Sequence, residues 1–289
     1  MNFTTHSEIK YWIDQLDILS SAKMCSAPRF LKPFHFASIC HILYGKQIES
    51  FTLPENIRSY ANSMMLYEAL GISPPRKVDR RDRAGKYHPI KLLKNESEVS
   101  RIAENLTAIL AEICGDINTI GAIFTTLEEM ISNCFAHSGS QSGVYGSVCA
   151  QLWERGNLAQ IAIADSGIGI RETLNQNPKL SSRLMNENSC EMAVQHGITG
   201  KPKEKHLGLG LALAKELVVR NNGVFYLLSG NEYFYVRQGR AKSGRISKHW
   251  KGTLLIIEIV LNNLIKISDV WDAWNSNERM ENVEFDIYF

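Results

Sequence analysis

The segment 127–138 constrains the fold strongly, because one helical pattern in it combines a polar stripe with an apolar face. Glu129, Asn133 and His137 recur four residues apart, so on a helix their side chains share one face, with Cβ atoms about 5–6 Å apart. Apolar side chains supply the other face, at Met130, Ile131, Cys134 and Phe135. The pattern predicts a helix that is buried against a sheet on one side and wetted on the other.

An apolar strand with a glycine-containing turn is predicted at residues 161–170, Ile-Ala-Ile-Ala-Asp-Ser-Gly-Ile-Gly-Ile. The strand ends at Asp165, and Gly167 and Gly169 lie in the turn behind it. An aspartate at a strand end is common simply as a turn residue. The polar stripe of the preceding helix gives Asp165 a second interpretation, as part of a site at the edge of the sheet.

Two glycines open an apolar helix in residues 206–214, His-Leu-Gly-Leu-Gly-Leu-Ala-Leu-Ala. Gly208 and Gly210 flank Leu209 at the start of this helix. Glycines at this position leave backbone N–H groups open to a phosphate, and the helix N-terminus adds favourable positive partial charge. The sequence therefore predicts a phosphate-binding turn.

Together these motifs resemble the GHKL ATPases, the family of type II topoisomerases, a heat-shock chaperone class, mismatch-repair ATPases and histidine kinases. The resemblance covers residues 95–261 and keeps the family's order of motifs. The motifs are Glu-x-x-x-Asn at Glu129, Asp-x-Gly-x-Gly at Asp165 and Gly-x-Gly at Gly208. Gly252-Thr253, before a strand at 254–260, resembles the family's closing strand.

The resemblance implies an α/β fold, a GHKL (Bergerat) α/β sandwich in which helices cover a mixed sheet. It implies ATP and Mg²⁺ as ligands, with Asn133 as magnesium ligand and Glu129 as the residue that activates water. Glu128 stands beside Glu129, but the spacing to Asn133 favours Glu129. The other implied nucleotide contacts are His137, Asp165, Gly167, Gly169, Lys201, Gly208, Leu209, Gly210 and Thr253.

Several of these implied contacts have a chemical reason or an alternative. A carboxylate at Asp165 suits adenine, whose exocyclic amine donates a hydrogen bond worth roughly 1.5–3 kcal/mol, whereas guanine presents an acceptor there. Thr253 is either an adenine support or a structural strand residue, and His137 is either a phosphate contact or a packed histidine. Three lysines are candidates for the γ-phosphate, with Lys201 matching the family's lid best: Lys201, Lys203 and Lys205.

Residues 1–73 are expected to form a small α/β domain. Its expected elements are helices at residues 7–20, after Pro33 and from Pro54 to Gly71, with a strand at 48–53. Residues 30–34 and the run Leu-Pro-x-Asn from Leu53, with Tyr60 and Met64, resemble the STAS-like segment that often precedes GHKL domains in bacterial proteins. An unrelated α/β cap is the alternative.

A basic linker is expected at residues 74–94, because arginine and lysine are dense there and apolar residues are few. A basic stretch can contact nucleic acid. Asp79 and Asp82 interrupt the charge, and few aromatic residues accompany it, so a solvated connector is the favoured interpretation.

The remaining elements follow from periodicity and turn signals. We expect a helix at 96–114, a hairpin of strands 143–153 and 159–164, a lid at 171–204 with a short helix near Cys190, strands at 224–229 and 233–236, a basic loop at 237–251 and a tail at 262–289. The lid assignment comes from the family resemblance.

Composition excludes some functional classes. The chain has 289 residues, 44% hydrophobic and 21% charged, with a net charge of +2, typical of a folded soluble protein without strong nucleic-acid or membrane attraction. Its six cysteines form no Cys-x-x-Cys pair, which argues against structural zinc. No apolar run reaches the length of a membrane span, and no signal-peptide pattern opens the chain, so we expect a cytoplasmic protein.

Three functions remain open at this point. The first is an ATPase that uses Mg-ATP binding and slow hydrolysis as a conformational switch for a protein partner or a dimer. The second is a protein kinase of the anti-sigma-factor serine type or the histidine type. The histidine type is disfavoured, because no helical hairpin with a phosphoacceptor histidine is evident before the domain. The third is a module that binds nucleotide without turnover.

Overall fold

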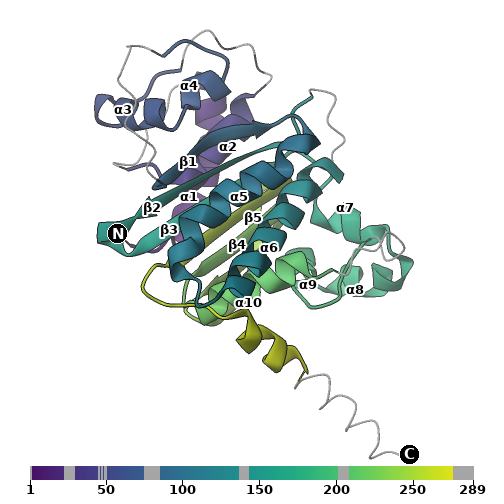
Figure 1. Ribbon diagram of the computed structural model, residues 1–289. Coiled ribbons are helices and arrows are strands. Elements are labelled where there is room, and N and C mark those ends of the chain that lie inside the picture. The colour runs from purple at the N-terminus through teal and green to yellow at the C-terminus, as the bar shows by residue number, and fades with distance from the viewer. Residues whose placement is uncertain are drawn as a thin grey trace, which may run out of the picture.

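The computed structural model describes residues 2–22, 30–44, 46, 48, 51–74, 85–136, 143–200 and 208–275. A five-stranded antiparallel sheet with the order β1-β2-β3-β5-β4 forms its centre (Figure 1). The strands are β1 (Tyr87–Leu93), β2 (Gly146–Trp153), β3 (Leu158–Asp165), β4 (Val224–Arg237) and β5 (Arg240–Val260). Strand β1 lies entirely within residues 74–94, so the part of that range from Tyr87 to Leu93 is a strand of the sheet and not the expected linker.

The predicted mixed sheet is wrong, because every pairing between the named strands is antiparallel. Tight connections join β2 to β3 and β4 to β5, which makes each of these pairs antiparallel. Between β1 and β2 the chain passes through two long helices rather than one. The pair of helices returns it to the end of the sheet where β1 stopped, so β2 also runs antiparallel to β1.

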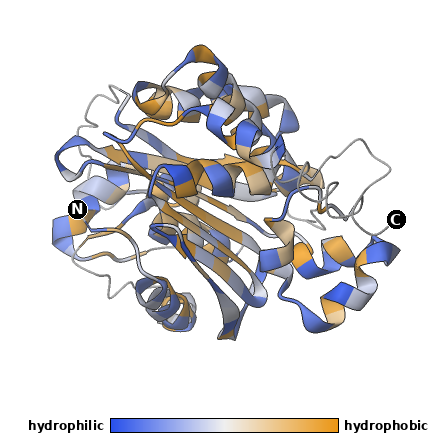
Figure 2. Ribbon diagram, turned by 90° about the horizontal axis from the view of Figure 1, so that it is seen from below, coloured by the Kyte–Doolittle hydropathy of each residue, from blue (hydrophilic) through white to orange (hydrophobic). Residues whose placement is uncertain are grey.

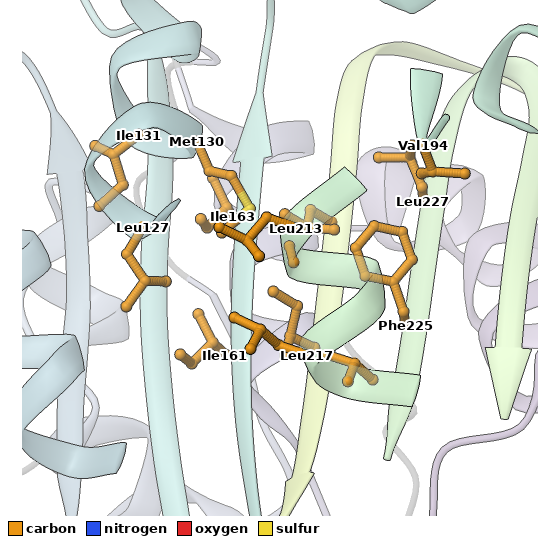
Figure 3. Close-up of a cluster of buried hydrophobic side chains, with 14 of the residues drawn as sticks. Leu127, Met130, Ile131, Ile161, Ile163, Val194, Leu213, Leu217, Phe225 and Leu227 are labelled. Carbon is orange, nitrogen blue, oxygen red and sulfur yellow. The ribbon is translucent and has the colours of Figure 1, made fainter. Parts of the chain in front are cut away.

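Three helices cover one face of the sheet: α5 (Val99–Leu110), α6 (Ile117–Ala136) and α10 (Gly210–Arg220). Figure 3 shows the core beneath them, where Leu127 and Ile131 of α6 and Leu217 of α10 gather with Ile161 of β3 and Phe225 of β4. Helix α6 confirms the helix that was predicted through Asn133. The helix expected at 96–114 is also present, as α5 with a short 3₁₀ turn at each end, Glu96–Glu98 and Ala111–Ile113.

The opposite face is covered by the N-terminal part of the chain. Its helices are α1 (His6–Ala22), α2 (Pro33–Leu43), α3 (Glu55–Ser63) and α4 (Leu66–Ala69). Their apolar side chains share one buried cluster with the sheet, including Ala162 and Ala164 of β3 and Tyr226 of β4. Figure 2 shows the largely hydrophobic strands between layers of helices.

Burial on both faces explains why β3 is apolar at almost every position. Successive strand residues point to opposite faces. Ile161 and Ile163 belong to the cluster under α6, whereas Ala162 and Ala164 belong to the cluster under the N-terminal helices. The small alanines leave room for α2 to approach the sheet, where the backbone N–H of Phe34 donates to the side chain of Gln160 at 3.0 Å.

The N-terminal part differs in detail from the expected α/β unit. Of its predicted strand at 48–53, the described residues contain only a single bridge, at Thr52. Pro33 begins α2 as predicted. The STAS-like resemblance and the domain boundary at residue 73 stay predictions.

Strands β4 and β5 form one long hairpin, which corrects two expectations. The predicted basic loop at 237–251 is the first half of β5, with the turn confined to Gln238 and Gly239. The two predicted strands 224–229 and 233–236 form the single strand β4, whose register shifts near Gly230. Ile246 and Trp250 of the misassigned segment are buried against the N-terminal helices.

Short helices fill the segment between β3 and α10: α7 (Ile170–Asn175), α8 (Ser181–Asn186) and α9 (Ser189–Ala193), with a 3₁₀ turn at Pro178–Leu180. Helix α9 confirms the short helix predicted near Cys190. Arg171 of α7 forms an ion pair with buried Glu232 of β4 at 2.7 Å, and the backbone N–H of Ser189 donates to the same carboxylate at 3.1 Å. This ion pair and hydrogen bond fasten the segment to the β4–β5 hairpin.

A further turn and a C-terminal helix complete the described chain. A 3₁₀ turn, Glu154–Gly156, connects β2 to β3 as the hairpin signal predicted. After β5, the backbone N–H of Ile267 donates to the buried hydroxyl of Thr119 at 2.9 Å, and residues 267–275 are helical. Within the described ranges no helix is long and apolar enough to cross a membrane.

Candidate functional site

A cavity that opens to solvent lies where α6, the start of α10, the end of β3, the middle of β5 and α7 meet. Seven residues singled out in the sequence line it, and they come from all four predicted motifs: Glu129, Asn133, Asp165, Gly169, Gly208, Gly210 and Thr253. Segments more than 100 residues apart in the chain therefore converge on one space.

Two predicted residues lie beside the cavity rather than in its wall. The backbone N–H of Gly167 donates to Asp165 Oδ1 at 2.8 Å and so holds the carboxylate in place. Leu209 is the residue before α10, and its carbonyl accepts the first helical hydrogen bond, from Leu213 N at 2.7 Å. Both residues shape the site through the backbone.

His137 and the three candidate lysines Lys201, Lys203 and Lys205 lie outside the described residues. Their assignments as phosphate contacts stay predictions. The described chain stops at Ala136 on one side of the cavity, and it stops at Gly200 and resumes at Gly208 on the other. Gly200 and Gly208 both line the cavity.

Asp165 is the best-defined polar group of the cavity wall. Burial raises its pKa to about 6, and hydrogen bonding from Gly167 and from the hydroxyl and backbone of Thr253 opposes that rise. Thr253 lies directly opposite Asp165 in the pairing of β3 with β5. A half-buried carboxylate, oriented by neighbouring donors and open to a cavity, is suited to accept a hydrogen bond from a ligand amine.

Gly252 makes this arrangement possible. Its φ angle is +78°, a left-handed conformation that favours glycine, and a Cβ atom there would lie 2.2 Å from the backbone oxygen of Asp165. The close approach lets β5 run directly beside Asp165 and place Thr253 opposite it. The glycine of the Gly-Thr motif is therefore required because a larger residue would overlap the backbone of Asp165.

Glu129 contacts the start of α10 across the cavity. The backbone N–H of Gly210 donates to Glu129 Oε1 at 3.3 Å, and a Cβ atom on Gly210 would lie 2.6 Å from Glu129 Cδ. A carboxylate is stabilised at a helix N-terminus, where unpaired N–H groups carry positive partial charge. The first and third sequence motifs thus meet in direct contact.

The oxygen and nitrogen atoms that line the cavity fit a magnesium ion that is bound mainly by phosphate oxygens and water, with little direct binding by the protein. Within the described ranges no group of three His, Cys, Asp or Glu residues is arranged to hold a metal ion by itself. Asn133 lines the cavity, and its side-chain amide carries one oxygen that can bind a metal. Mg²⁺ is commonly bound by one or two protein oxygens together with phosphate oxygens and water, so this set suits it.

The apolar wall of the cavity was missed as a set by sequence reasoning. It is formed from α6, α10, three strands, the α7–α9 segment and the turn after it, by Met130, Cys134, Ile163, Ile170, Leu174, Ala193, Ile198, Leu211, Leu227 and Leu255. The strand members could have been found, because Ile163 lies two residues before Asp165 and Leu255 two residues after Thr253, on the same face. Thr173 and Thr199 carried no such signal.

Comparison with known proteins agrees with the geometry. Residues 93–221 match the family model described as a histidine kinase-like ATPase domain. The matched range runs from the end of β1 to the end of α10 and contains the first three motifs. The match supports ATP binding by this part of the chain. A search of curated proteins gave no significant match.

Proposed function

We propose that the protein binds Mg-ATP in this cavity and hydrolyses it slowly, as a conformational switch for a protein partner or a second copy of the chain. One observation carries the proposal. An amide, two carboxylates and a glycine-rich helix start, predicted from separate motifs, line the same cavity. Their chemistry is complementary to the metal, the base and the phosphates of ATP.

The roles follow from what each group can accept or donate. Asp165 accepts the exocyclic amine of adenine, and the apolar side chains of Met130, Ile163 and Leu255 enclose the ring. Asn133 contributes a neutral oxygen toward magnesium, which when bound gathers the phosphate charges. The N–H groups at the start of α10 receive phosphate oxygens.

Glu129 is the residue proposed to orient and deprotonate the attacking water. Its carboxylate already lies at the phosphate end of the cavity, against Gly210 N. General-base catalysis of this kind contributes typically about 10²–10⁴-fold to a rate. We therefore expect Glu129→Gln to lower the rate of phosphate release by at least about 100-fold and to retain nucleotide binding.

The test uses γ-labelled ATP and magnesium with the full chain. Wild type is expected to release labelled inorganic phosphate, and Glu129→Gln is expected to bind ATP without release. Glu128→Gln is the matched control, because Glu128 lies one position away and bonds to the hydroxyl of Ser100 rather than facing the cavity. Unchanged release by Glu129→Gln would remove its assigned role.

The same experiment separates the remaining alternatives. Label that appears on the protein or on a serine of an added partner identifies a kinase. ATP binding with neither release nor transfer identifies a nucleotide-binding module. Absence of ATP binding contradicts the proposal as a whole.

A further inference from the structure

We propose that Ser229 of β4 is a positioning residue that orients Asp165 for adenine, through the peptide bond between Gly252 and Thr253. The inference rests on the proposed nucleotide function. Ser229 belongs to none of the motifs recognised in the sequence and does not line the cavity. It lies opposite Thr253 in the β4–β5 pairing, on the far side of β5 from Asp165.

The hydroxyl of Ser229 connects two segments that shape the site. Its side chain accepts from the backbone N–H of Ile170 at 2.9 Å and donates to the carbonyl oxygen of Gly252 at 2.7 Å. Only 4% of the residue is exposed, so water does not compete for these bonds. Ile170 begins α7 and lies directly after the turn that follows Asp165.

The carbonyl of Gly252 belongs to the same peptide group as the N–H of Thr253. A peptide group is planar, so fixing its oxygen also fixes the direction of its N–H. That N–H and the Thr253 hydroxyl both lower the pKa of the Asp165 carboxyl, against the rise that burial causes. From the other side the N–H of Gly167 donates to the carboxylate, and Ser229 fixes the far end of this turn through Ile170.

Ser229 thus connects, through hydrogen bonds, the two backbone segments that lie on either side of Asp165. The order is Ile170 N–H to Ser229 Oγ, Ser229 O–H to Gly252 O, and Thr253 N–H toward the carboxylate. Removing the central hydroxyl leaves the Ile170 N–H and the Gly252 carbonyl buried without this partner. The peptide group is then free to tilt, and the carboxylate loses part of its support.

Other titratable groups face Asp165 from α6 and must be kept constant in a test. Cys134 and Glu129 line the same cavity, and burial raises the pKa of the Cys134 thiol, with a further upward contribution from the nearby charge of Asp165. Among the described residues, the lining of β5, α7 and α10 adds no further charged side chain. Variants at Ser229 leave all of these groups unchanged.

The experiment measures the dissociation constant of ADP by calorimetry, between pH 5 and pH 8, for wild type and Ser229→Ala. At pH 7.5 we expect the variant to bind about fivefold to tenfold more weakly, the effect of one lost hydrogen bond. We also expect the pH midpoint of binding to move upward, because the ionised carboxylate has lost a stabilising donor. A purely structural role would leave the midpoint unchanged and would contradict the proposal.

Two conservative variants keep the test valid if Ser229→Ala unfolds. Ser229→Thr keeps the hydroxyl but adds a methyl group, whereas Ser229→Cys keeps the size but offers only a weak donor. We expect the threonine variant to bind ADP more tightly than the cysteine variant. The reverse order, set by size, would overturn the proposal.

Wild type and Asp165→Asn distinguish this inference from the proposed function. If wild type does not bind ADP, the proposed function fails. A second outcome refutes only the role of Ser229. In that outcome wild type binds ADP, Asp165→Asn weakens binding, and Ser229→Ala leaves binding unchanged.

Discussion

At the scale of single residues, Asp165 combines a cost in stability with its proposed use in binding. Burial raises its pKa from 3.8 to about 6, so at neutral pH the protein keeps ionised a carboxylate that its surroundings disfavour. Residues with this property concentrate at functional sites. The group is half-buried at the cavity, where a ligand that donates a hydrogen bond compensates for the lost hydration.

The raised pKa predicts opposite effects of pH on binding and on stability. Adenine requires the ionised form, so ATP affinity should decrease as the pH falls through about 6. The effect on stability is the reverse. The raised pKa of folded Asp165 adds to the free energy of unfolding in full below the unfolded-state pKa of 3.8, and this addition is lost as the pH rises through about 6. Calorimetric titration with ATP and thermal unfolding, each between pH 5 and 8, measure the two effects.

Asp165→Asn should separate the same two effects at one pH. At pH 7.5 we expect ATP affinity to fall by about tenfold or more, the loss of about 1.5–3 kcal/mol for a charge-assisted bond. The melting temperature without nucleotide should rise, because no buried charge is left. Unaltered ATP affinity would remove Asp165 from the adenine site.

Gly252→Ala should damage both the fold and the site. Alanine in a left-handed conformation costs about 1–2 kcal/mol, and its Cβ would also overlap Asp165 O at 2.2 Å. Gly239 in the β4–β5 turn is a matched control, since its φ is +72° and no atom lies within 4 Å of the place that a Cβ would take. Equal melting temperatures for the two alanine variants would contradict the steric argument.

At the scale of elements, local periodicity was sufficient for α6, α10 and β3, and insufficient for β5. Helix α6 and strand β3 have apolar patterns that persist over their whole length. In β5, lysine and arginine alternate with the buried Ile246 and Trp250, and this alternation was outweighed by the density of charge. The burial of these two residues depends on α1 and α2, which no local pattern reveals.

The site shows the same division between local and distant information. Glu129, Asn133, Asp165 and Gly210 were predictable because each stands in a motif with fixed spacing. Ser229 was not predictable, because its two partners, Ile170 and Gly252, are distant in the sequence and their backbone groups have no sequence signature.

The layer of N-terminal helices is held to the sheet by a buried polar network that offers a second test. Lys32, whose side chain is 8% exposed, lies 3.8 Å from the fully buried Glu258 of β5 and donates to Thr4 Oγ1 at 2.8 Å. Gln160 of β3 donates to Glu258 at 2.7 Å. The network connects the neighbouring strands β3 and β5 to the beginning of the chain.

Lys32→Met should destabilise the protein by about 3–5 kcal/mol, because Glu258 would keep its buried position without the cation. Lys10→Met is the control. Its ion pair with Asp14 lies partly exposed on α1, where an i,i+4 pair contributes about 0.3–0.5 kcal/mol. Urea denaturation measures both, and similar midpoints would argue against a structural role for the network.

At the scale of the whole molecule, the N-terminal helices and the segment 93–221 share the sheet rather than meeting at a surface. The same strand β3 contributes Ile163 to the cavity side and Ala162 to the N-terminal side. A sheet face this apolar needs a cover in water. The family match begins only at residue 93, and the cover precedes it.

Deletion of residues 1–73 should therefore yield an aggregating protein rather than an isolated ATP-binding domain. It would expose an apolar face that includes Tyr226, Leu228, Leu254 and Ile256. Size-exclusion chromatography and binding of a hydrophobic dye measure the outcome. A monomeric, folded deletion protein that binds ATP would favour the independent STAS-like domain instead.

The contact between Glu129 and the N–H of Gly210 has a consequence for how nucleotide enters. A phosphate that reaches the start of α10 meets a position already taken by a negative group of the protein itself. A phosphate group therefore binds only by displacing the Glu129 carboxylate, and a small anion without adenine has no further contacts to compensate for that displacement. Glu129, the proposed catalytic residue, would thus disfavour binding of the free phosphate that its own reaction releases.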